Sequence, residues 1–437
     1  MHRPAVIVGA VCAGDVAAGV GFAVARGWPV AVQATGHGLS SVLEGGVLVS
    51  TRRMSGVRVD PAAGTVWVEA GVRWERVVAE AARFGLAPLN GSAPHVGAVS
   101  YVLGGGLALL GRTFGYAADR VRRMEVVTAG GRVHQVTPDS DADLFFALLG
   151  GRDNFGVVTG LEIGLVPVSR VYGGGLYFPG ELAEGVLGAW REWTATVPDE
   201  MNSSVGLMLH PDVPFVPEPL RGRYVAHIRI AYTGSAVAGR RLVAPLRAVG
   251  PRLLDTLRDM PYGASGSIFE DPVHPHGYAG DNALLDSLPP EAPRAVLDIA
   301  GPGAPVLCIV DLRHLGGALA RPPAVPNAVG HRDAAYILRV LSPVGPWKIE
   351  EVVPVHERLL RAVGDGPPRR NPNFLYGAGR PTTPEQVGSF YDAATHRRLA
   401  RLKAVHDPGN VFRVNHNIRP GAGAPGSGPT EGQAHGV

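Results

Sequence analysis

The sequence has 437 residues, of which 46% are hydrophobic and 18% are charged, and its formal net charge is +3. A chain of this length exceeds one ordinary hydrophobic core, so we expect two domains or one large two-lobed unit. The small net charge, with arginines scattered along the chain, gives no argument for nucleic acid or an anionic membrane as a partner.

The sequence carries no pattern typical of a metal site, a disulfide framework or a membrane anchor. Its two cysteines, Cys12 and Cys308, lie far apart, and none of its 15 histidines occurs in a His-Glu-x-x-His motif. No apolar run reaches the roughly 18 residues of a membrane span, and the apolar stretch 5–8 is too short for a signal peptide. We therefore predict no metal, no membrane partner and a cytoplasmic location.

The first 166 residues predict strands mixed with helices. A strand at 5–8 precedes a helix at 15–26, whose valines recur at every fourth residue, and a second strand follows at 29–34. This segment is a predicted βαβ unit. Further strands are predicted at 46–50, 56–60, 65–69, 121–128, 132–136 and 157–165, with helices at 71–84 and 141–149.

The pattern changes after residue 168. Strands at 173–178, 204–209 and 224–232 now alternate with helices at 182–195 and 236–246. Because direct βαβ repetition ends here, we expect an antiparallel sheet covered by helices, and hence an α+β fold. A last helix is predicted at 384–405. Residues 421–437 are rich in Gly, Pro, Ser and Thr and are predicted to be disordered.

Three glycine-rich loops stand out in the first 160 residues, at 36–38, 91–106 and 150–156. Glycine allows positive φ and close approach of the backbone to a ligand, and consecutive N–H groups in such turns bind anions. Neither a P-loop nor a strand–Gly-x-Gly-x-x-Gly–helix unit is present. We therefore expect the three loops to converge on one elongated ligand, with His37 fixed in the first of them.

These loops, in this order, resemble those of the berberine bridge enzyme-like flavoprotein oxidases, which share the vanillyl-alcohol oxidase (PCMH-type) FAD-binding fold. The matching segments are 30–38, 91–97, 103–106, 110–115, 150–158 and 401–412. The resemblance implies an FAD-binding domain in two pieces, residues 1–166 and 372–420. The second piece is the C-terminal berberine-bridge-like segment, and the two pieces enclose a substrate domain at 167–371.

The resemblance also implies how FAD is held. His37 falls where the family joins the flavin 8α-methyl group to an imidazole, and neutral imidazole is plentiful near pH 7. Many relatives add a thioether from a cysteine in the next loop, but Ala93 stands there, so a single covalent bond through His37 is expected. The cofactor-binding residues implied are Ala34, Thr35, Gly36, His37, Gly38, Leu39, Ser92, Ala93, Val96, Gly97, Gly104, Gly105, Gly106, Asn154, Gly156, Val158 and Asn373.

Three residues are candidates for catalysis: Val96, His95 and Tyr336. Val96 matches the position that controls access of O2 to the flavin, where valine is associated with oxidases; its alternative is an ordinary buried valine. His95 is either a proton-transfer group or a polar turn residue, and Tyr336 is either the substrate base or a half-buried strand tyrosine.

The usual catalytic tyrosines of the family's Tyr-x-Asn-Tyr pattern are replaced here. Asn371 and Phe374 stand at the two tyrosine positions, and only Asn373 matches. Relatives also carry further residues before the strand that here begins at Ala5, and that segment packs against their FAD domain. The resemblance therefore leaves open whether this chain loads its cofactor.

The resemblance implies an FAD-dependent oxidase. It would remove a hydride from an alcohol, hemiacetal or amine-type carbon of a sugar or secondary metabolite, with O2 as the acceptor and H2O2 as the product. The alternatives are a flavin dehydrogenase with another acceptor, or a degenerate FAD-binding protein without turnover. Neither the substrate nor the oligomeric state follows from the sequence.

Overall fold

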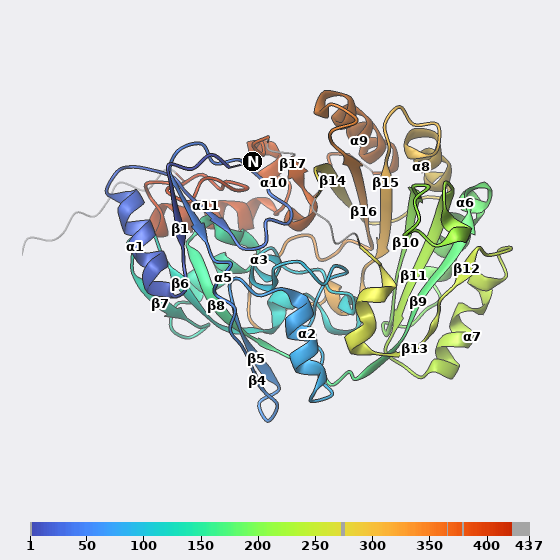
Figure 1. Cartoon of the computed structure of the whole chain (residues 1–437), viewed down its shortest axis with the longest axis horizontal. Coiled ribbons are helices and arrows are strands. Elements are labelled where there is room, and N and C mark those ends of the chain that lie inside the picture. Colours follow the sequence, from blue (N-terminus) through green and yellow to red (C-terminus); the bar gives the residue numbers. More distant parts are fainter. Residues whose placement is uncertain (1, 272–275, 365, 378–379, 422–437) are drawn as a thin grey trace, which may run out of the picture.

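The computed structural model describes residues 2–271, 276–364, 366–377 and 380–421, and it shows two parts lying side by side (Figure 1). The tail predicted to be disordered lies outside the described residues, except Gly421, whose N–H donates to the Ala400 carbonyl at 2.8 Å. Within the described ranges, no helix is both long and apolar enough to cross a membrane.

The first part begins with a small parallel sheet of order β1-β3-β2. Its strands are β1 (Val6–Gly9), β2 (Val30–Gln33) and β3 (Val47–Ser50), and helix α1 (Ala13–Val24) connects the first two. Two of the recurring valines of α1, Val16 and Val20, are buried as their spacing predicts, whereas Val24 at the end of the helix is exposed. The predicted βαβ unit is present, with β3 inserted between its two strands.

A five-stranded sheet of order β4-β5-β8-β6-β7 follows, and all its pairs are antiparallel. Helices α2, α3 and α5 pack on it around a core that includes Trp74, Phe145 and Phe155. The elements are β4 (Val57–Asp60), β5 (Thr65–Glu69), α2 (Trp74–Ala82), α3 (Ala98–Leu103), α4 (Gly111–Phe114), β6 (Val121–Val127), β7 (Val133–Val136), α5 (Ala142–Gly151) and β8 (Val157–Gly164).

The second part is a nine-stranded antiparallel sheet whose outer face is covered by four helices (Figure 1). Its strand order is β12-β9-β11-β10-β15-β16-β14-β17, and β13 pairs with β9. The strands are β9 (Arg170–Pro179), β10 (Met201–Leu209), β11 (Tyr224–Tyr232), β12 (Leu254–Asp255), β13 (Arg258–Pro261), β14 (Tyr278–Leu285), β15 (Ile309–His314), β16 (Tyr336–Pro343) and β17 (Tyr376–Gly377). The helices are α6 (Ala183–Thr194), α7 (Ala236–Arg247), α8 (Ala292–Ala300) and α9 (Ile349–Val363). The predicted α+β class is confirmed.

Alternation along the strands of the large sheet separates two chemically different faces. On β11, Ile228 and Ile230 pack with the covering helices, whereas His227 and Arg229 point to the opposite face. We call this opposite face, which lies toward the first part, the inner face. It carries polar side chains, which would face water if the second part stood alone.

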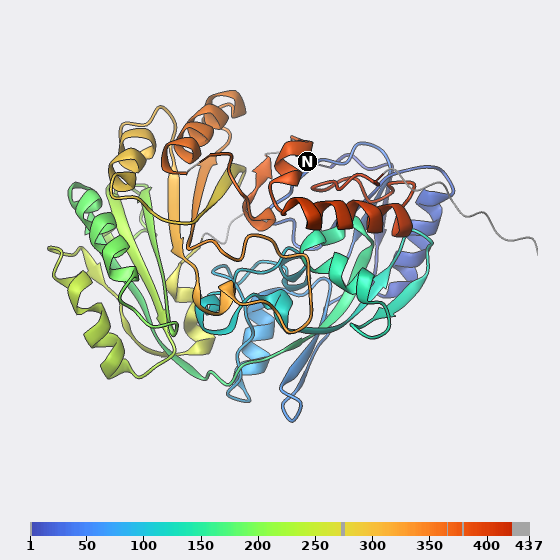
Figure 2. The same cartoon turned by 180° about the vertical axis from the view of Figure 1, so that it is seen from behind.

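The chain returns to the first part after β17. Helices α10 (Pro384–Gly388) and α11 (Ala393–His406) lie against it (Figure 2). The prediction of a single helix at 384–405 is wrong, because a short non-helical segment separates the two helices. Asp392 caps α11 by accepting hydrogen bonds from the N–H groups of Ala394 and Thr395, both at 2.9 Å.

Two arginines join the parts, the buried Arg112 and the half-buried Arg332. The Arg112 guanidinium of α4 donates to the Met201 carbonyl at 2.9 Å and to the Leu315 carbonyl. Arg332 forms an ion pair with Asp119 at 2.6 Å. Each pair bridges residues that are distant in sequence, so the inner face of the large sheet is held against the glycine-rich loops of the first part.

Candidate active site

His37 lies in a turn with positive φ at both flanking glycines, 78° at Gly36 and 66° at Gly38. Its ring is surrounded by other aromatic side chains. Ring centroids lie 5.4 Å away for His95, 6.3 Å for Tyr278 and 6.4 Å for Tyr376. The first glycine-rich loop, the second loop and the edge of the large sheet therefore meet at this imidazole.

The imidazole of His37 is accessible to solvent but closely surrounded by protein. Desolvation by that protein, and secondarily the neighbouring His95, lowers the pKa of His37 to about 4. The ring is therefore neutral at pH 7, the state in which an imidazole nitrogen is a nucleophile.

The second loop carries Ser92, Ala93, His95 and Val96, of which His95 lies beside His37. Ala93 is buried, and His95 Nδ1 is buried without a hydrogen-bond partner among the described residues. Val96 is half-buried, and its carbonyl accepts the Trp74 N–H at 3.0 Å, which ties the loop to α2. Of the two candidate residues of this loop, His95 thus lies next to His37, whereas Val96 packs against the hydrophobic core of the first part.

Gly104 and its neighbours end α3 where the C-terminal return packs closely on the first part. A Cβ on Gly104 would collide with the Asn373 side chain. Asn373 Nδ2 donates to the Tyr101 carbonyl at 2.9 Å, and Arg152 donates to Asn373 Oδ1 at 3.3 Å. Asn373 therefore connects the second loop, the third loop and the C-terminal return.

The side chains predicted on the third loop point into the protein. Asn154 donates to the Gly151 carbonyl at 2.9 Å and accepts the Ile418 N–H at 2.9 Å, so its amide is occupied. Val158 belongs to the hydrophobic core, and Gly156 packs against the main chain of β6. The expected contact of these residues with the adenine end of FAD stays a prediction.

Tyr336 also lies away from His37. Its hydroxyl is 2.7 Å from Thr194 Oγ1, and its ring contacts Trp190, both on helix α6. Tyr336 shares the helix-covered face with Leu338, whereas Arg339 between Leu338 and Val340 points to the inner face. The sequence already indicated that Tyr336 faces the helices, because Leu338 and Val340 follow it at every second residue and alternate residues of a strand share a face.

The sequence analysis did not predict an ion cluster that lies on the inner face. Asp311 accepts from Arg313 Nε at 2.7 Å, from Arg339 Nη1 at 2.8 Å and from Arg229 Nη1 at 3.1 Å. Burial alone would raise the pKa of Asp311, but the three guanidinium groups hold it below its usual range. The cluster is composed of residues from β11, β15 and β16, so only the register of the folded sheet assembles it.

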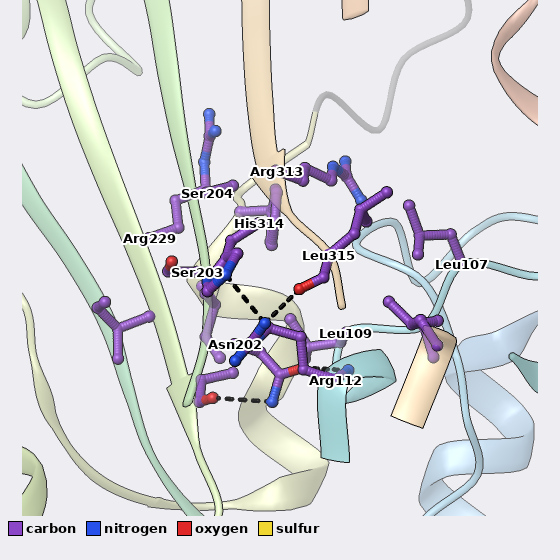
Figure 3. Close-up of a pocket in the computed structure, with 16 residues that line it drawn as sticks. Leu107, Leu109, Arg112, Asn202, Ser203, Ser204, Arg229, Arg313, His314 and Leu315 are labelled. Carbon is purple, nitrogen blue, oxygen red and sulfur yellow. Dashed lines mark hydrogen bonds between the residues drawn. The ribbon is translucent and has the colours of Figure 1, made fainter. Parts of the chain in front are cut away.

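A pocket of about 40 Å³ lies beside this cluster, between the inner face and the segment Leu107–Leu109 (Figure 3). Its lining includes Arg229 and Arg313 of the cluster, together with Arg112 and Asn202. Arg313 Nη2 is 3.5 Å from Ser92 Oγ, so the cluster and the loop of His95 border the same region.

The comparisons with known proteins agree with this architecture. Residues 4–137 match the family described as "FAD binding domain", and residues 380–419 match "Berberine and berberine like". The chain is 27% identical to (R)-6-hydroxynicotine oxidase of Paenarthrobacter nicotinovorans over 440 residues, covering 96% of this chain and 92% of that one.

Two solved structures show the same fold. The 6-hydroxy-D-nicotine oxidase of Arthrobacter nicotinovorans has a TM-score of 0.83 at 25% identity, covering 96% of this chain and 93% of that one. Glucooligosaccharide oxidase of Acremonium strictum, described with a 6-S-cysteinyl, 8α-N1-histidyl FAD, has a TM-score of 0.81 at 19% identity over 96% and 93% of the two chains.

The two parts and their loops define a PCMH-type FAD-binding fold joined to a substrate domain. The chain carries both of these domains and resembles the berberine bridge enzyme-like FAD-linked oxidoreductases along its length.

The residues present fit FAD. Within the described part of the chain, the N–H groups of Gly36 and Leu39 donate to no other residue, and free backbone N–H groups of a glycine turn suit a pyrophosphate. His37 offers a neutral imidazole at the next position, and Ala93 offers no second attachment.

Proposed function

We propose that this protein is an FAD-dependent oxidase whose flavin is bonded to His37 alone. The observation that carries the proposal is the neutral His37 ring in the glycine turn, with His95, Tyr278 and Tyr376 around it. Neutral imidazole can attack the flavin 8α carbon, and Ala93 lacks the sulfur for a second bond. The histidyl linkage described for glucooligosaccharide oxidase supports the same position here.

Bound FAD would accept a hydride from the substrate carbon and pass the electrons on to O2. Overall, an alcohol, hemiacetal or amine-type carbon of a small molecule loses two electrons and two protons, and O2 gains them to give H2O2. Sugars and secondary metabolites are the proposed substrate class.

The chain's own residues hold the reactants and move protons. Burial raises the pKa of Tyr376, so its hydroxyl stays protonated and can donate a hydrogen bond at pH 7. His95 offers an unpartnered Nδ1 beside the attachment site and is the proposed proton carrier. Val96, half-buried on the same loop, is proposed to leave O2 a path to the flavin.

The test is anaerobic mixing of the purified protein with a panel of sugars, alcohols and amines while flavin absorbance is recorded. Bleaching by a substrate, followed by return of the colour and H2O2 formation on admission of O2, supports the oxidase. Bleaching without reoxidation by O2 favours the dehydrogenase. A bound flavin that no member of the panel reduces favours the protein without turnover.

A further inference from the structure

The arginine cluster of the inner face carries more positive charge than its partners neutralise. Asp311 is the shared partner of Arg229, Arg313 and Arg339. Asp271 acts on Arg229 and Arg339 through space, but forms no ion pair with either among the described residues. Three cations against two carboxylates leave one surplus positive charge in a buried region, where screening by water is weak.

Several polar groups of the cluster have nothing to bind within the protein. Nε of Arg229, Nε of Arg339 and Oγ of Ser204 are buried without a hydrogen-bond partner in the described part of the chain. Native proteins rarely leave buried donors unsatisfied, and such groups mark places where something outside the chain completes the network. The surplus charge and the free N–H groups call for the same partner, an anionic acceptor.

The guanidinium groups are held in fixed planes. Arg229 and Arg313 lie 4.8 and 4.9 Å from the Phe269 ring, and Arg339 lies 4.1 Å from the Phe374 ring. A guanidinium that is fixed in one plane binds a carboxylate through paired hydrogen bonds with little loss of side-chain freedom.

The main chain of β10 also makes room for Arg229. A Cβ on Gly206 would lie 2.5 Å from Arg229 Nη1, so glycine leaves the room that this guanidinium occupies against the sheet.

The space next to the cluster suits a small charged group, such as the carboxylate of a larger molecule. The pocket of about 40 Å³ has Arg229, Arg313, Ser204 and Phe269 in its lining (Figure 3). Since one water needs roughly 10–15 Å³ of such volume, the pocket accommodates a group of a few heavy atoms. Arg313 in the pocket lining also contacts Ser92, which precedes His95 by three residues on the second loop.

We propose that this arginine cluster binds a carboxylate of the substrate, with Arg229 and Arg313 in the pocket lining and Arg339 adding its charge, and thereby selects monoanionic substrates for the oxidase. This inference deepens the proposed function, on which it rests for the place of the anion beside the flavin. Asp311 and Asp271 balance two of the three positive charges, and the surplus positive charge is matched by one carboxylate.

The test uses the purified full chain and isothermal titration with two probes of the same shape, benzoate and its neutral counterpart benzamide. Wild type is expected to bind benzoate at least about tenfold more tightly than benzamide, since hydrogen bonds to a charged group are the stronger ones. Arg229→Gln is expected to weaken benzoate about 10–100-fold and to leave benzamide nearly unchanged.

Asp311→Asn separates ligand binding from a purely structural role. Removal of this negative charge raises the local positive potential, so benzoate binding is expected to strengthen or hold; a structural cluster would loosen and bind more weakly. Arg294→Gln, on the exposed surface of α8, is the matched control with wild-type binding.

Equal affinities of benzoate and benzamide for wild type would overturn the inference, whichever variants fold. So would a change of flavin reduction potential in Arg229→Gln without loss of benzoate affinity, because the charge would then serve the cofactor. Failure of the proposed function would give a different result, a protein that purifies without flavin. In that case the titration still shows whether the arginine cluster binds an anion.

Discussion

Lys403 and Asp407 form an ion pair inside the first part, and its disruption should destabilise the protein strongly. Lys403 Nζ donates to Asp407 Oδ2 at 2.6 Å, to the Asn154 carbonyl at 2.6 Å and to the Phe412 carbonyl at 3.0 Å. Both charged side chains are 0% exposed. Asp407 also accepts the Val411 and Phe412 N–H groups, so one pair fixes the end of α11 to the third loop.

Lys403→Met removes the cation, keeps the side-chain length and leaves the Asp407 carboxylate buried without its counter-charge. Breaking a buried pair in this way costs about 3–5 kcal/mol. Urea denaturation followed by tryptophan fluorescence should show this loss in the free energy of unfolding. Lys403→Met combined with Asp407→Asn should recover part of it, because no uncompensated charge remains.

A matched control lies on α8, where Arg294 and Asp298 form an ion pair with the same spacing at 3.0 Å but with 67% and 57% of their side chains exposed. Arg294→Met should change stability by less than about 1 kcal/mol, since exposed pairs contribute little. A loss in Lys403→Met no larger than that of the control would refute the electrostatic reasoning for the buried pair.

Three further predictions concern pH and the glycine turns. Burial lowers the pKa of His356 to about 4 from its usual 6.5, so its contribution to stability is complete above pH 6.5 and falls as the pH drops toward 4. Between pH 6.5 and 5.5 this histidine should account for about 1 kcal/mol of lost stability in urea unfolding, and His356→Gln should show a shallower pH dependence; an unchanged slope would contradict the assigned pKa. Gly38→Ala places a Cβ 2.7 Å from the Tyr376 ring at a φ of +66°, so purified protein should contain less flavin per chain, and wild-type flavin content would count against the turn as a cofactor loop. Gly104→Ala should displace Asn373 and likewise lower flavin content, whereas Gly185→Ala, in open space on α6, should leave it unchanged.

Periodicity predicted most of the regular structure because hydrophobic spacing is a local property. The helices at 15–26 and 182–195 appear as Ala13–Val24 and Ala183–Thr194, and the antiparallel sheet covered by helices is confirmed. The break before α11 had a local signal too, since Asp392 followed by Ala-Ala-Thr is a helix-capping pattern.

The inner face could not be predicted in the same way. Arg229, Asp311 and Arg339 come from three strands, and their contact depends on strand register, which the sequence does not reveal. Tyr376 follows Asn373 by three residues, yet only the pairing of β17 with β14 places it beside His37. The family pattern directed attention to Asn371 and Phe374 and away from this neighbouring tyrosine.

The attachment of flavin at His37 is the central claim, and acid precipitation of the purified protein tests it most directly. The account predicts that the yellow colour stays with the precipitated wild-type protein and passes to the supernatant in His37→Ala. Flavin that enters the supernatant from wild type, or that stays with the precipitate of His37→Ala, would contradict it.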